Sequence, residues 1–305
     1  MATSDTISQR LPISLSDKGR RSIIAWLAIA PALTITLLYR FFPVGYNFYL
    51  SFHTMDIAGS LTFVGLENYS RALTDPVFAK SAINTVYLLG TIPVGITIAL
   101  GVALLLNEQF FGSNAFRSVF FIPYITMMVA VAVVWQYMFK TNGGVLNFIL
   151  LNVGIVSRPV EWLSSEQLSF VSVFIVQVWK TVGFYMIIII AGLQGISQQV
   201  YEVAQIDGAT RWQRFRYVTL PLLKPTLGVC ALVGLVTSFR AFDLIMTMLP
   251  NGGPNYGAEI LLTWMYKQAF SYGDFGYGAV LTVVLFVMMV GFALMGRILQ
   301  QGNYQ

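Results

Sequence analysis

Charged and polar side chains inside long apolar runs are the residues whose types and spacing could do chemistry in this chain. Arg240 and Asp243 lie three residues apart in one such run, a spacing that would place both on one face of a helix. The two groups either neutralise each other inside a bundle of helices, or line a polar cavity and hydrogen-bond a hydroxylated solute. The two interpretations are compatible, because a paired charge in a cavity wall can do both.

A second apolar run carries Gln177, Lys180 and Tyr185. Because burying a charge in lipid is costly, we expect Lys180 either in the same cavity or against a neighbouring subunit. Pro93 and Pro123 interrupt two further runs. Such breaks can mark a moving gate, but we favour the interpretation that neighbouring groups satisfy the carbonyl that each proline frees.

The sequence shows no reactive constellation of an enzyme. Its only histidine is His53, expected on the surface of a polar loop, and its only cysteine is Cys230, in an apolar run. Histidine-based zinc sites, Ser-His-Asp hydrolysis, thiolate clusters and an intrachain disulfide are therefore not expected. The Gly-x-x-x-x-Gly-Lys-Ser/Thr motif is missing, so another subunit must bind any ATP that drives the protein. Nucleic-acid binding is not expected either, because it would require a basic patch on a folded soluble domain.

Membrane-spanning helices are the elements that must position these residues. Of 305 residues, 56% are hydrophobic and 10% are charged, whereas a soluble domain carries about 25% charged residues. A spanning helix needs about 20 mostly apolar residues. Six segments predict an all-α, polytopic membrane protein with six transmembrane helices: 22–39, 83–106, 119–137, 168–193, 226–249 and 278–299. The first segment can continue through residues 41–52.

Lys and Arg residues predict the orientation of these helices. With the N-terminus in the cytoplasm, ten of the eighteen lie in cytoplasmic segments, six lie outside, and Lys180 and Arg240 lie in spans. The densest basic cluster, within residues 211–224, then falls in the cytoplasm. An even number of spans places both termini on that side.

The segment between the fourth and fifth spans is more ordered than a short solvated loop. Apolar residues recur at helical spacing on both sides of Gly208, which predicts two amphipathic helices joined by a sharp turn. These residues are Val200, Val203, Ala204 and Ile206 before the turn, and Trp212, Phe215 and Val218 after it. Such a pair, held outside the bilayer, suggests a docking surface for a soluble partner.

This segment closely resembles the coupling loop of permease subunits of ATP-binding-cassette (ABC) importers. That loop runs Glu-Ala-Ala, then Asp-Gly-Ala, then a hydrophobic residue, any residue, Leu and Pro. The residues that match in type and spacing are Glu202, Ala204, Asp207, Gly208, Ala209, Val218, Leu220 and Pro221. Val203 stands in place of the usual second alanine.

Other segments extend the resemblance to carbohydrate-importer permeases. Similarity to the first permease of maltose- and glycerol-phosphate-type systems lies in Phe242-Asp243, Asn251-Gly252-Gly253-Pro254 and Tyr266-Lys267-Gln268-Ala269-Phe270. The resemblance implies the type I ABC importer permease fold. It also implies a second homologous permease, two ABC ATPase subunits that bind ATP and Mg, and an extracytoplasmic solute-binding protein.

Two sets of functional residues follow from this resemblance. The ATPase-coupling residues would be Glu202, Ala204, Asp207, Gly208, Ala209, Trp212, Phe215, Leu220 and Pro221. The substrate pathway, near the middle of the membrane, would include Thr181, Tyr185, Ser238, Arg240, Phe242 and Asp243. Each set has a structural alternative: the two acidic coupling residues cap and solvate helices, and the aromatic residues pack within the permease.

We therefore expect a non-catalytic permease in the inner membrane of a prokaryotic cell, surrounded by lipid, that carries a sugar, polyol or glycoside. Its plan would be a cytoplasmic tail (1–21), a transmembrane domain (22–299) containing the coupling loop (197–224), and a second cytoplasmic tail (300–305). One alternative is a permease for glycerol 3-phosphate or another phosphorylated solute, because the guanidinium of Arg240 suits phosphate. Asp243 would offset that charge and favours a neutral solute. A lower-ranked alternative, an ion-coupled secondary transporter, would need ion sites inside the bundle.

Overall fold

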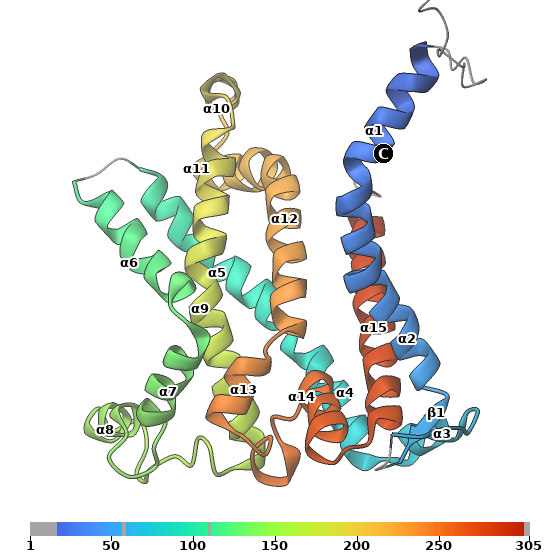
Figure 1. The fold of residues 1–305 in the computed structure, drawn as a ribbon. Helices are drawn as coiled ribbons and strands as arrows, with labels where there is room; N and C mark the ends of the chain where they lie inside the picture. Colours follow the sequence, from blue (N-terminus) through green and yellow to red (C-terminus); the bar gives the residue numbers. More distant parts are fainter. Residues whose placement is uncertain (1–16, 57–58, 109–110, 302–305) are drawn as a thin grey trace, which may run out of the picture. The chain divides into compact units, whose positions relative to one another are not determined.

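The computed structural model of the chain describes residues 17–56, 59–108 and 111–301 (Figure 1). The chain forms two compact units, Met1–Tyr49 and Leu50–Gln305. Most of the expected N-terminal tail (residues 1–16) and most of the expected C-terminal tail (residues 302–305) lie outside the described residues.

A long apolar helix makes up the described part of the first unit. α1 (Asp17–Thr36) passes into a π-helical turn, η1 (Leu37–Phe41), and then into α2 (Phe42–Leu50). The wider turn lies just before Pro43, whose ring and missing N–H disturb the hydrogen bonding of the preceding turn. Residues Ile24–Leu50 are long and apolar enough to span a membrane. The first span therefore continues past residue 39, as the sequence allowed.

Four stretches of the second unit are also long and apolar enough to span a membrane: Pro76–Asn107, Glu166–Gln194, Arg211–Phe239 and Phe275–Gly296. They comprise α4 (Pro76–Leu88) with α5 (Thr91–Asn107), then α9 (Glu166–Gln194), then α11 (Arg211–Arg214) with η2 (Phe215–Thr219) and α12 (Leu220–Phe239), and finally α15 (Phe275–Gln301). With one bent helix pair, the described residues contain up to six spans. The prediction of an all-α, polytopic fold is confirmed.

The bent pair is the third expected span. α6 (Ser113–Ile125) and α7 (Met128–Met138) meet at an angle of 98°. Thr126 and Met127, between them, have extended backbone angles (ψ 139° and 130°), so neither continues the helix. Pro123 lies in the last turn of α6. The sequence therefore placed this span correctly but did not predict that it turns.

The fifth span ends earlier than the sequence predicted. α12 stops at Phe239, and a short helix, α13 (Phe242–Met248), follows after two residues. Arg240 and Ala241 leave the helical range, with ψ angles of 21° and 28°. The prediction that Arg240 and Asp243 share one helix face is wrong, because the helix breaks between them. They form no ion pair with each other among the described residues.

α9 is the central helix of the second unit (Figure 1). It packs against α5, α6 and α12. Of its most apolar 18-residue stretch, 61% is buried, whereas the corresponding share is 33% or less in the other candidate spans. One core cluster joins Ala99 and Ala103 of α5 to Met186 and Ile189 of α9 and to the buried thiol of Cys230 in α12. The burial of Cys230 agrees with its apolar sequence context. Residues placed by α9 are therefore fixed by contacts on several sides.

Short elements fill the segments between the spans. They are β1 (His53–Met55) and β2 (Leu61–Phe63), which pair antiparallel, α3 (Glu67–Thr74), α8 (Val145–Asn152), the 3-10 turn η3 (Pro254–Tyr256), α14 (Leu261–Tyr266) and the π-helical turn η4 (Lys267–Ser271). His53 is 8% exposed, and its ring packs edge-on against Phe63. The prediction of a surface histidine is wrong, because His53 lies in β1 and packs against the paired residue of β2.

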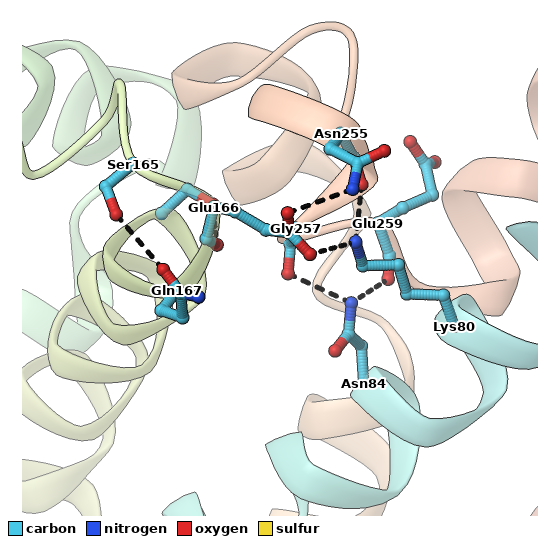
Figure 2. A network of polar contacts seen from close by, with 9 residues as sticks. Lys80, Asn84, Ser165, Glu166, Gln167, Asn255, Gly257 and Glu259 are labelled. Carbon is cyan, nitrogen blue, oxygen red and sulfur yellow. Dashed lines mark hydrogen bonds and ion pairs between the residues drawn. The ribbon is translucent and has the colours of Figure 1, made fainter.

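Residues 250–260, here called the strap, connect α13 to α14 and are bound to two spans (Figure 2). The ammonium of Lys80 in α4 pairs with the carboxylate of Glu166, at the start of α9, and donates to the carbonyl of Asn255 at 2.6 Å. The Asn255 amide donates back to Glu166 at 2.9 Å. Asn84 of α4 donates to the carbonyls of Gly257 and Glu259 at 3.0 and 2.9 Å. The strap thus ties the ends of α4 and α9 together.

Candidate functional site

A glycine turn joins α10 (Gln198–Ile206) to the helix that enters the fifth span. Gly208 has φ +79°, a left-handed angle that side chains with a Cβ adopt only at a cost. The N–H of Gly208 donates to Gln205, and the N–H of Ala209 donates to Ala204 at 2.9 Å, so the turn satisfies carbonyls at the end of α10. A Cβ on Gly208 would meet nothing within 4 Å. Glycine is therefore favoured here by backbone angle and not by space.

Thr210 starts the next helix. Its side-chain oxygen accepts from the N–H of Gln213 at 3.3 Å, and the Gln213 side chain accepts from the N–H of Thr210 at 2.8 Å. This reciprocal capping box satisfies two backbone donors that the first turn of a helix leaves unpaired. The turn is consequently capped on both sides within a few residues.

Side-chain contacts hold the two arms of the turn together. The hydroxyl groups of Tyr201 in α10 and Thr219 in η2 lie 3.1 Å apart. The guanidinium of Arg214 donates to the side-chain oxygen of Gln205 at 3.4 Å. We refer to residues 197–224 as the coupling segment, following the sequence prediction. Its two helices form one compact element at the end of the second unit opposite to α13 and α14 (Figure 1).

The predicted coupling residues divide by exposure. Glu202, Asp207, Gly208, Trp212 and Pro221 are exposed, whereas Ala204, Ala209, Phe215 and Leu220 are half-buried. Neither acidic side chain takes part in a hydrogen bond or ion pair with another described residue, and Thr210 provides the cap of α11. The structure thus leaves both carboxylates free of a capping role in the described chain.

Large apolar side chains surround the glycine turn. Ile206 is 85% exposed, and Trp212 is 69% exposed although its ring contacts Phe215 at 5.5 Å between centroids. Val203, at the position of the usual second alanine, is 57% exposed. Exposed apolar side chains grouped with carboxylates on a rigid element suit a protein partner.

The predicted pathway residues fall into two groups, of which the first is buried. Thr181 and Tyr185 of α9 and Ser238 of α12 are at most 4% exposed. The hydroxyl of Ser238 lies 3.2 Å from that of Thr91 in α5. A Cβ on Gly234 of α12 would lie 2.5 Å from the Tyr185 hydroxyl, so that glycine makes room for the ring. These residues form a polar contact between α5, α9 and α12 within the chain.

The second group lies at the break that follows α12. Arg240 and Asp243 are exposed, one in the break and the other in the first turn of α13. Phe242 is half-buried, and its ring packs edge-on against Tyr266 of α14 at 4.9 Å between centroids. Charged groups in this part of the chain are therefore accessible, whereas the hydroxyl groups of the first group are not.

Two buried features escaped the sequence analysis. Glu259 of the strap pairs with Lys267 of η4, and their side chains are 0% and 9% exposed. The side-chain oxygen Oε1 of Gln177 is buried without a hydrogen-bond partner among the described residues. Eight residues separate Glu259 and Lys267, which is no regular helical neighbour spacing. No pattern in the sequence could have paired them.

The fold defines a class: an α-helical membrane transport subunit in which a compact coupling segment projects between two spans. The family described as "Binding-protein-dependent transport system inner membrane component" matches residues 91–303, and the chain belongs to it. The chain is thus a multi-pass inner-membrane permease of an ABC importer, as the sequence predicted. That membership does not favour the ion-coupled alternative.

Several relatives match nearly the whole chain. The trehalose/maltose transport system permease protein MalF of Thermococcus litoralis is 34% identical over 91% of this chain and 93% of its own. The sulfoquinovosyl glycerol transport system permease protein SmoG of Agrobacterium fabrum is 34% identical over 89% and 88%. The lactose transport system permease protein LacF of Rhizobium radiobacter is 32% identical over 87% and 89%.

A solved structure shares the fold. A chain of a bacterial ABC transporter involved in the import of the acidic polysaccharide alginate superimposes with a TM-score of 0.79, at 21% identity, covering 92% of this chain and 96% of that one. A further structure of a bacterial alginate ABC transporter, in complex with alginate pentasaccharide-bound periplasmic protein, matches with a TM-score of 0.76. The similarity supports the permease architecture at the level of the fold.

Proposed function

We propose that this chain forms half of the translocation pathway of an ATP-driven importer for a sugar, polyol or glycoside. The observation that carries the proposal is the coupling segment, a doubly capped pair of helices joined to α12 without a break and to α9 through a short turn. The names of the relatives at 32–34% identity, which refer to trehalose/maltose, lactose and sulfoquinovosyl glycerol, support the class of solute.

The partners in this proposal are a second homologous permease, two ATPase subunits and a solute-binding protein. The ATPase subunits would bind ATP and Mg, and would contact Glu202, Asp207 and the exposed apolar residues near Gly208. Closure of the ATPase pair would then move α9 and α12, because rigid helices transmit displacement. This arrangement requires the coupling segment and both termini in the cytoplasm, in agreement with the distribution of Lys and Arg.

The pathway in this proposal passes the break at residues 240–241. Arg240 and Asp243 would hydrogen-bond solute hydroxyl groups, and Phe242 would offer an aromatic face to the C–H surface of a sugar. The buried residues of the first group would not contact the solute but would fix α9 and α12 against α5; they are Thr181, Tyr185 and Ser238. A phosphorylated solute remains an outcome of the test, because Arg240 is exposed; the nearby Asp243 carboxylate disfavours it.

Uptake by proteoliposomes containing the assembled transporter tests the proposal. With ATP inside and loaded binding protein outside, labelled disaccharide should accumulate, and neither glycerol 3-phosphate nor an ion gradient without ATP should substitute. Uptake driven by an ion gradient in the absence of the ATPase subunits would contradict the proposed energy source. ATP-dependent uptake restricted to a phosphorylated solute would instead overturn the proposed class of solute.

A further inference from the structure

Lys180 lies at the centre of α9, as the fifteenth of its twenty-nine residues. Its ammonium donates to the carbonyl oxygens of Pro123 at 3.0 Å, Tyr124 at 3.3 Å and Thr126 at 2.6 Å. An ammonium group has three N–H donors and no acceptor, so all three donors have a partner here. Within this chain, the cation is therefore committed to the backbone of α6 and its exit.

The carbonyls that Lys180 binds are those that the bend leaves without helical partners. The last turn of a helix has carbonyls with no intrahelical donor, and in a bilayer each unsatisfied polar group costs several kcal/mol. Pro123 and Tyr124 contribute two such carbonyls from the last turn of α6, and Thr126 contributes one from the break. The cation also lies at the negative end of the α6 dipole, which favours it further.

Two neighbouring contacts bring α6 close enough for this arrangement. A Cβ on Gly183, three residues after Lys180 on the same side of α9, would overlap the backbone carbonyl of Phe120. The rings of Tyr124 and Phe184 stack at 4.2 Å between centroids, with 13° between their planes. A glycine contact and a ring stack therefore fix the distance at which the ammonium reaches three oxygens.

The bend determines where α7 lies. Beyond Thr126 the chain turns by 98° into α7, and Val131 and Ala132 of α7 join the core cluster that contains Leu244 and Ile245 of α13. The side-chain amide of Gln136 also donates to the carbonyl of Met248 at 3.3 Å. α13 begins directly after the break at residues 240–241. A continuous set of contacts thus leads from Lys180, through the bend and α7, to the break.

We propose that Lys180 is a positioning residue, whose ammonium holds the third span bent and so places α7 against α13 beside the break at residues 240–241. The proposal assigns the charge in the fourth span to the backbone of its own chain. It does not require Lys180 to touch the solute. The geometry of the bend can be tested whether or not the proposed solute class is right; only the uptake test below rests on the proposed function.

Spin labels on the two arms of the bend measure the first part of the proposal. Cys230→Ala removes the only cysteine, and Asn114→Cys in α6 and Val134→Cys in α7 place labels at exposed positions of the assembled transporter in nanodiscs. A straight helix would separate these positions by about 30 Å, whereas two arms meeting at the observed angle separate them by about 20 Å. The native lysine should give the shorter distance.

Three substitutions separate charge and donors from side-chain volume. Lys180→Arg keeps a cation with several donors and should keep the short distance between the labels. Lys180→Met keeps the length of the side chain but loses the charge and the donors. It should therefore shift or broaden the distribution of distances toward the longer value. If Lys180→Met does not assemble, Lys180→Leu, which is neutral, shorter and without donors, is compared with Lys180→Arg in its place. A short, narrow distance in the neutral variant would overturn the proposal.

Uptake kinetics test the link to the break. Lys180→Met should raise the KM for solute by about tenfold, equivalent to about 1.4 kcal/mol, and Lys180→Arg should restore it.

Lys140→Met is the matched control, because Lys140 is exposed and its ammonium lies over the ring of Tyr137, away from the bend. An unchanged KM together with a lengthened distance would disprove the link to the break and leave the bend assignment standing. Absence of uptake in the native transporter would count against the proposed function alone.

Discussion

At the scale of single residues, close contacts between backbones decide which side chains meet. Gly183 is the clearest case, because α6 lies against it where any Cβ would overlap the Phe120 carbonyl. Small residues let membrane helices approach in this way, and the approach gains packing and hydrogen bonds that lipid cannot replace. The meeting of Lys180 with three carbonyl groups depends on that approach.

Gly183→Ala should therefore destabilise the permease. An added methyl group in a packed contact costs about 1–3 kcal/mol, and here it pushes α6 away from α9. Thermal unfolding of the purified transporter in detergent should show a lower midpoint. Gly101→Ala in α5 is the control, because a Cβ at Gly101 meets nothing within 4 Å. Equal midpoints for the two variants would contradict the inferred contact.

Individual residues also show how far the sequence could lead. The two helices of the coupling segment and the turn between them could be predicted, because helical spacing around a glycine is a local feature of the sequence. The burial of Ser238 and the exposure of Arg240 could not be predicted from the sequence. The two residues are only two positions apart, and their exposure depends on where α12 ends. Periodicity gave no sign of that end, because the apolar pattern of the sequence continues through α13.

At the scale of elements, the strap is a strained connection held by polar contacts. Asn255 and Tyr256 both have positive φ, 48° and 56°, an arrangement that costs about 1–3 kcal/mol per residue. The contacts of Asn255 with Lys80 and Glu166 hold the strap in this conformation. The ion pair of Lys80 with Glu166 is only partly exposed, because the two side chains are 29% and 40% exposed.

Lys80→Met should release the strap. The stability lost through the ion pair of Lys80 with Glu166 should itself be small, because the pair is partly solvated. Hydrogen exchange of residues 250–260 should nevertheless accelerate, since loss of the contacts lets the strained backbone relax. Arg71→Met, which breaks the ion pair of Arg71 with Asp274 outside the strap, is the control and should leave the strap unchanged. Equal exchange in both variants would show that the strap does not depend on Lys80.

Elements that meet through distant residues were beyond the sequence. The spans could be predicted from apolar length, and five of the six expected segments needed only changed ends or an extension. The bend in the third span could not be predicted from the sequence. Pro123 marked its place, but a proline alone does not determine the angle between two helices. A donor from another helix is needed to satisfy the exposed carbonyls, and Lys180 lies 54 residues away from Thr126 in the chain.

At the scale of the whole molecule, the proposed coupling of ATP hydrolysis to uptake would be a property of the assembled transporter. Gly208→Val tests it, because valine is strained at φ +79°, at a cost of about 1–2 kcal/mol, while the space around the position is open. The variant should insert and assemble normally, hydrolyse ATP with its partners, and transport little solute. Uptake and hydrolysis measured on the same proteoliposomes give the ratio that checks this.

Gly154→Val provides the matched comparison. Gly154 has φ +75° and equally open surroundings, but it lies in the connection between α8 and α9 and not in the coupling segment. The two variants therefore introduce the same backbone strain at different places in the chain. If both variants transported normally, or both lost uptake equally, the turn at Gly208 would have no special part in coupling.

The helical run from Arg211 to Phe239 contains a π-helical turn, Phe215–Thr219, and has a mechanical consequence. α12 alone holds 20 residues and extends about 30 Å, long enough to cross the apolar layer and reach residues 240–241. In the proposed mechanism, displacement of the coupling segment would be carried along α12 to the point where this helix ends. We therefore expect the movements that open and close the proposed route for solute to be concentrated at residues 240–241.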